Sequence, residues 1–126
     1  MRILPAYAAL FALIFVYLSL RTIGLRRKLQ IGVGDGDNPL MLRAMRVHAN
    51  FAEYVPFALL LVFLVESQGA RAGLVHGLCA TLLVGRLLHA WGVSQTRENF
   101  RFRISGMVLT FATLVSAALY LLIVTL

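Results

Sequence analysis

The chain has 126 residues, of which 60% are hydrophobic, and a formal net charge of +7. Its mean hydropathy of +0.85 excludes a soluble fold of this size and predicts an integral membrane protein with one domain, residues 1–126. The basic residues are dispersed among apolar spans. This dispersion argues against nucleic-acid binding, which uses basic residues gathered on one face.

Four apolar stretches are long enough to cross a bilayer as helices, which takes about 20 residues each. The glycine- and Asx-rich segment 32–39 separates the first two, and Asn38 followed by Pro39 is typical of a helix start. The predicted spans are 3–25, 39–66, 72–94 (or 72–92) and 103–126. The sequence therefore predicts an all-α membrane protein, a bundle of four transmembrane helices.

The connections between these spans differ in charge. Four spans place loops one and three on one side of the membrane, with loop two and both termini on the other. The first side carries Arg26, Arg27, Lys28, Arg97, Arg101 and Arg103, and the second carries Arg2 and Arg71. Because basic loops are retained in the cytoplasm, we expect loops one and three to be cytoplasmic.

The second span contains a polar stripe at its cytoplasmic half. At about 100° per residue, Arg46, Asn50 and Glu53 fall on one face of a helix. Charged side chains in a membrane helix usually face the bundle interior, a cavity or a partner. Arg86 and His89 of the third span lie near the same depth, so this level is the candidate site.

Positive charge dominates at this depth. Within the helices, Glu53 is the only acidic residue there. The cations near this level are Arg26, Arg43, Arg46, Arg86, Arg101 and Arg103. An anionic ligand would balance them, because guanidinium groups offer paired donors to carboxylate or phosphate. Glu53 could then accept from a ligand ammonium, which favours a small zwitterion with surplus carboxylates.

These residues also form a recognisable pattern. The sequence Arg46-x-x-x-Asn50-x-x-Glu53-Tyr54-x-Pro56, followed by Arg86-x-x-His89 and an arginine opening the last helix, resembles the MAPEG family of membrane-associated proteins in eicosanoid and glutathione metabolism. The resemblance covers nearly the whole chain. Three shorter segments are most similar to the bacterial YecN-like branch: Gly34-Asp35-Gly36, Gly85-Arg86-Leu87 and Arg103-x-Ser105-Gly106-Met107.

The resemblance implies a left-handed four-helix bundle in the bacterial inner membrane, assembled as a homotrimer that binds glutathione between subunits. It implies that Arg46, Asn50 and Glu53 hold the polar ends of the tripeptide. Further lining residues would be Arg86, His89 and, from a neighbouring subunit, Arg26. Arg103, with Arg101 as second choice, would stabilise the glutathione thiolate for transferase or peroxidase-type chemistry on a small lipophilic substrate.

Two departures keep alternatives open. Active members usually carry tyrosines near the positions of Val93 and Met107. The chain could therefore bind a small anion or lipid headgroup without catalysis, or act as a structural subunit whose arginines meet acidic partners. The polar stripe could be an interhelical network, and Arg103 a membrane-surface anchor. The three histidines are expected on separate faces or levels, so no metal site is predicted.

Overall fold

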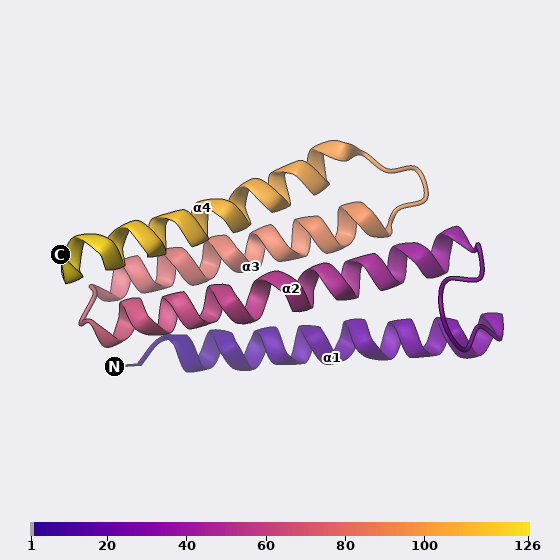
Figure 1. The fold of residues 1–126 in the computed structure, drawn as a ribbon, viewed down its shortest axis with the longest axis horizontal. Helices are drawn as coiled ribbons and strands as arrows, with labels where there is room; N and C mark the ends of the chain where they lie inside the picture. Colours follow the sequence, from indigo (N-terminus) through magenta and orange to yellow (C-terminus); the bar gives the residue numbers. More distant parts are fainter. Residues whose placement is uncertain (1) are drawn as a thin grey trace.

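The computed structural model describes residues 2–126 as four helices packed side by side (Figure 1). Each helix is long and apolar enough to cross a membrane. The helices are α1 (Leu4–Leu29), α2 (Pro39–Ser67), α3 (Ala72–Ser94) and α4 (Phe100–Thr125). Loops one and three lie at one end, and both termini and loop two at the other. The prediction of an all-α, four-helix transmembrane bundle is confirmed.

Asparagine caps fix where two helices begin. The Asn38 side chain accepts hydrogen bonds from the backbone N–H groups of Leu40 (3.0 Å) and Met41 (3.1 Å), so α2 starts at the predicted Pro39. Asn99 does the same for the N–H of Arg101 at 3.1 Å. As a result α4 begins at Phe100, three residues before the predicted start, and Arg103 lies within its first turns.

The first helix extends beyond its predicted end. It continues through Arg26, Arg27 and Lys28 to Leu29, where the sequence predicted an exit at residue 25. Basic side chains are favourable at a helix C-terminus, where the backbone dipole is negative. Gln30 then ends α1 in a left-handed conformation, with φ of 56°.

Three glycines allow α3 and α4 to pack closely. Gly85 and Gly92 on α3 face Gly106 and Phe102 on α4, and a Cβ atom built on Gly106 would lie 2.6 Å from the backbone N of His89. Small residues at a membrane helix interface let the two backbones approach. This approach brings Arg86 and His89 of α3 directly against α4.

Candidate functional site

Arg86 is the centre of a buried polar network that joins three helices. Its side chain is 1% exposed, although it lies within a membrane-spanning helix. The Nη2 group donates to Asn50 Oδ1 on α2 and lies 3.0 Å from His89 Nδ1 on α3. The Nη1 group donates to Thr110 Oγ1 on α4 at 3.3 Å. The network therefore holds α2, α3 and α4 in register.

Neutral groups surround the Arg86 guanidinium. Met107 Sδ lies 3.7 Å from Nη1, and the ring of Tyr54 lies under the guanidinium at 5.9 Å from its centroid. Within residues 2–126 no carboxylate bonds to this cation, and its Nε has no hydrogen-bond partner. The charge is thus stabilised by oriented dipoles and an aromatic face and has no counterion of its own.

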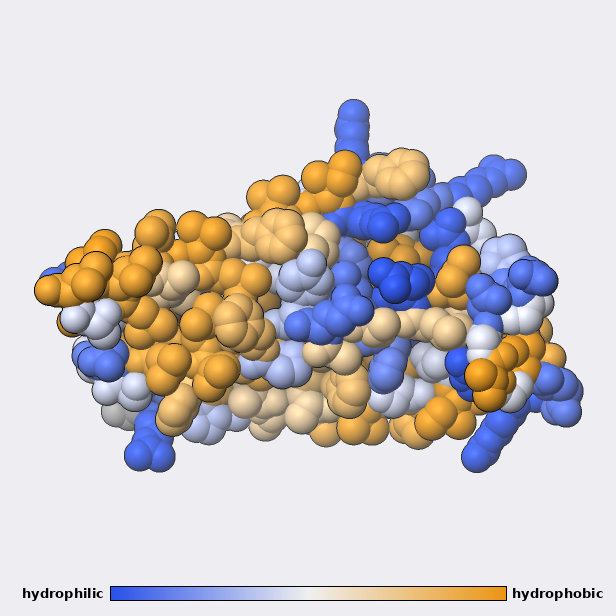
Figure 2. Space-filling view, in the orientation of Figure 1, coloured by the Kyte–Doolittle hydropathy of each residue, from blue (hydrophilic) through white to orange (hydrophobic). Residues whose placement is uncertain are grey.

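Separate from the Arg86 network, three arginines line a hollow between α2 and the start of α4. We call it the arginine hollow; its volume is about 260 Å³. It is lined by Pro39, Leu42, Arg43, Arg46, Val93, Glu98 and Arg103. On the face that Figure 2 shows, hydrophilic residues are concentrated toward the end with loops one and three, and the opposite half is largely hydrophobic. The hollow is therefore at the polar end of the bundle.

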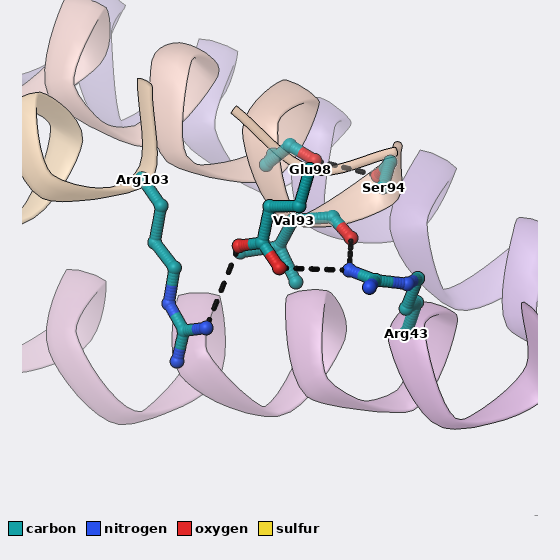
Figure 3. Close-up of polar contacts among 6 residues, drawn as sticks. Arg43, Val93, Ser94, Glu98 and Arg103 are labelled. Atoms are coloured by element: carbon teal, nitrogen blue, oxygen red, sulfur yellow. Dashed lines mark hydrogen bonds and ion pairs between the residues drawn. The ribbon is translucent and has the colours of Figure 1, made fainter. Parts of the chain in front are cut away.

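One carboxylate bridges two of these arginines (Figure 3). Arg43 Nη1 lies 3.0 Å from Glu98 Oε2, and Arg103 Nη1 lies 3.4 Å from Glu98 Oε1. Arg43 also donates to the carbonyl oxygen of Val93 at 3.0 Å. The Glu98 side chain is 9% exposed, compared with 26% for Arg43 and 50% for Arg103. Loop three is thereby tied to α2 and α4 by a shared anion.

Glu98 corrects the charge balance expected from sequence. The sequence argument counted Glu53 alone, since Glu98 falls in the predicted third loop and outside the helices. The structure turns the Glu98 carboxylate inward between two guanidiniums, so part of the positive charge is balanced within the chain. Three arginines to one glutamate still line the hollow. An excess of positive charge therefore remains in the hollow, although it is smaller than predicted.

The predicted stripe on α2 is divided between inside and outside. Asn50 is half-buried and joins Arg86, whereas Arg46 and Glu53 are exposed on this single chain. Glu53 lies at the middle of α2, so its carboxylate is at membrane depth on an outer face. A lipid-exposed carboxylate at that depth is costly. This face of α2 is therefore suited to contact with another protein surface.

The remaining predicted residues lie apart from both clusters. Arg26 donates to backbone carbonyls of its own loop, at 3.3 Å to Ile31 and 2.9 Å to Gly34. Arg101 is exposed on α4 and does not line the arginine hollow. The structure thus brings together Asn50, Arg86 and His89 in one group and Arg46 with Arg103 in another.

Sequence reasoning missed two members of these clusters, Thr110 and Glu98. Thr110 on α4 could have been found from its spacing, since Gly106-x-x-x-Thr110 places two small residues on one helix face. Arg43 was counted among the cations at this depth, but its partner was not predicted. Its pairing with Glu98 joins residues 55 positions apart, and no local pattern predicts such a contact.

The sequence was compared with known families and proteins. The model of the MAPEG family matches residues 4–123. The chain belongs to the MAPEG family. The inner membrane protein YecN of Escherichia coli strain K12 is 37% identical over 108 residues, which are 86% of this chain and 81% of that protein. YecN of E. coli O6:H1 strain CFT073 matches equally. No solved structure matches the chain.

Membership of the MAPEG family confirms the resemblance inferred from the motifs on α2, α3 and α4. Two positions at which this MAPEG chain departs from the expected tyrosines are now placed. Val93 is buried at the arginine hollow, and its carbonyl oxygen accepts from Arg43. Met107 packs against Arg86. Neither position supplies a phenol to the polar clusters.

Proposed function

We propose that this MAPEG protein forms a homotrimer in the bacterial inner membrane, with loops one and three cytoplasmic. We propose further that it binds glutathione at the arginine hollow, where neighbouring copies meet, and conjugates it to a small lipophilic electrophile. The bilayer would deliver this second substrate. The observation that carries the proposal is the surplus of guanidinium groups over carboxylates in the arginine hollow.

Glutathione matches the hollow in charge. The tripeptide has two carboxylates and one ammonium group, and guanidiniums bind carboxylates through paired, charge-assisted hydrogen bonds. Arg46 and Arg43 would hold one carboxylate, and Glu53 on the same face of α2 would accept from the ammonium. Asn50 and Arg86, with His89, would support the pocket wall through their buried network.

Assembly is supported by the exposed polar face of α2. The charged Glu53 carboxylate is energetically costly beside lipid. Burial against another copy would remove that cost only if a ligand or a side chain neutralised the carboxylate. A second copy would also bring its own Arg26 to the neighbourhood of the hollow. The site would then be completed between subunits.

Arg103 is the better choice for stabilising the thiolate. It lines the arginine hollow, whereas Arg101 is exposed on α4 and does not line the hollow. A nearby positive charge favours the thiolate, which is the nucleophile. In the reaction, the thiolate sulfur forms a bond to an electrophilic carbon. The displaced electron pair then departs with a leaving group, or is protonated after addition to a conjugated bond.

Binding of the anion without turnover is the second candidate. It is favoured by Val93 and Met107, because no tyrosine is among the described residues that line the arginine hollow. A phenol can donate a hydrogen bond to a thiolate, and neither of these side chains can. This candidate keeps the glutathione site and omits the conjugation step.

We expect Arg46→Ala and Arg103→Ala each to weaken glutathione binding by about tenfold, the effect of losing one charge-assisted hydrogen bond of modest strength. Calorimetric titration of the purified oligomer with reduced glutathione measures this. Arg97→Ala is the matched control, because Arg97 is exposed in loop three and does not line the hollow. Unchanged binding in both hollow variants, or no binding to the unmodified protein, would refute the site.

Glu98 competes with an anionic ligand for Arg43 and Arg103. Glu98→Gln keeps the shape of the side chain and removes its charge, so we expect glutathione to bind about three- to tenfold more tightly. The same titration checks this, with Asp37→Asn in loop one as the control for a lost surface carboxylate. Weaker binding in Glu98→Gln would mean that the carboxylate positions the arginines and does not compete for them.

A further inference from the structure

A long groove separates α1 from α3, and no residue that lines it also lines the arginine hollow. It consists of two adjoining hollows, of about 570 Å³ and 290 Å³, that share Arg21 and Ser94. α1 and α3 make few contacts with each other, whereas α2 packs against both. We call this feature the α1–α3 groove. Its larger hollow has the volume of an ordinary ligand pocket.

The larger hollow is apolar over most of its length. Its lining includes Leu13, Ile14 and Leu87, with the aromatic rings of Tyr17 and Trp91 nearer to the polar end. Tyr17 is 65% exposed and Trp91 54% exposed, so both rings face the groove or the surrounding lipid. Tyrosine and tryptophan favour the headgroup level of a bilayer. The groove thus runs from hydrocarbon depth toward the membrane surface.

The other end of the groove is basic. Arg21 Nη1 donates to Ser94 Oγ at 2.9 Å, which fixes the guanidinium at the junction of the two hollows. Lys28 lines the smaller hollow about two turns further along α1. Neither hollow has an acidic residue in its lining. Arg21 is about 26 Å along α1 from Leu4, at 1.5 Å per residue. This depth is close to the boundary of a hydrocarbon core about 30 Å thick.

We propose that the α1–α3 groove binds an anionic phospholipid. One acyl chain would occupy the apolar hollow between Leu13, Tyr17 and Leu87. The phosphate would lie at Arg21 and Lys28, where two cations without a local carboxylate match its charge. Ser94 holds Arg21 through one nitrogen and leaves its other donors to the phosphate. This site is independent of glutathione binding and uses none of the residues that line the arginine hollow. The two sites come nearest in the sequence at Val93, which lines the hollow, and Ser94, which lines the groove.

Native mass spectrometry of the delipidated oligomer in non-ionic detergent tests the proposal. The probes are dioleoylphosphatidylglycerol, dioleoylphosphatidylcholine and inorganic phosphate. We expect the unmodified protein to retain phosphatidylglycerol in preference to phosphatidylcholine. Arg21→Ala should reduce that preference by about tenfold. Arg27→Ala is the matched control, because Arg27 is on the same helix end and lines neither hollow.

A second variant tests acyl-chain binding separately from phosphate binding. Leu87 is 49% exposed and lines the groove, so Leu87→Trp should fill the hollow without disturbing the core. We expect it to weaken both phospholipids while the oligomer persists in size-exclusion chromatography. Equal retention of the two lipids, an unchanged preference in Arg21→Ala, or competition by inorganic phosphate alone would overturn the proposal. So would dispersal of the oligomer by Leu87→Trp, which would identify the groove as a contact between copies.

Discussion

Replacing Arg86 by alanine is expected to lower the free energy of unfolding of the bundle by about 2–4 kcal/mol. Two effects add. The substitution empties the space of a side chain that is 1% exposed, and the surrounding helices can close this cavity only in part. It also removes the hydrogen-bond donor from the half-buried Asn50 oxygen and from the buried Thr110 hydroxyl, which loses its contact with α3.

Unfolding of the purified protein by sodium dodecyl sulfate in mixed micelles, followed by circular dichroism, measures the Arg86 effect. Arg86→Met retains most of the volume and loses the hydrogen bonds, so it should fall between the unmodified protein and Arg86→Ala. Arg101→Ala is the control, and an exposed substitution of this kind should change stability by no more than about 0.5 kcal/mol. If Arg86→Ala were no more damaging than Arg101→Ala, the network would not hold the helices together.

The helices and their order follow directly from the sequence. The lengths of the apolar runs determine four spans, and the Asn38-Pro39 pair marks the start of α2 to the residue. The start of α4 was placed three residues too late because the prediction followed hydropathy. Asn99 caps that helix through a local hydrogen bond, and the capped turn includes Arg101, which lies outside the predicted span. Hydropathy locates the segment that crosses the membrane, and the capping residue determines where the helix begins.

The candidate site was harder to predict because it depends on which neighbour covers each side of a helix. Periodicity placed Arg46, Asn50 and Glu53 on one face of α2. It could not indicate that α3 would cover Asn50 while Arg46 and Glu53 stayed outside. Glu98 shows the same limit, because its role depends on loop three folding back between α2 and α4. The position of a residue around its own helix can be predicted from the local sequence, but its burial depends on how the neighbouring helices pack.

The close packing of α3 and α4 makes Gly106→Ala the second strongly destabilising change, by about 2–3 kcal/mol. The added Cβ would lie 2.6 Å from the carbonyl oxygen of Gly85 and from the backbone N of His89. Backbone atoms cannot rotate away, so the helices must separate. Gly77→Ala on α3 is the matched control, since nothing lies within 4 Å of a Cβ built there.

The two glycine variants should move stability in opposite directions. Alanine is a better helix former than glycine, so Gly77→Ala should be neutral or stabilise by up to about 1 kcal/mol. Detergent-induced unfolding again reports both changes, and equal behaviour of the two variants would contradict the close approach at Gly106. Separation of α4 from α3 would also draw Thr110 away from Arg86 and shift Arg103 at the arginine hollow. At the glutathione site that we propose, Gly106→Ala should therefore weaken binding without removing any polar side chain.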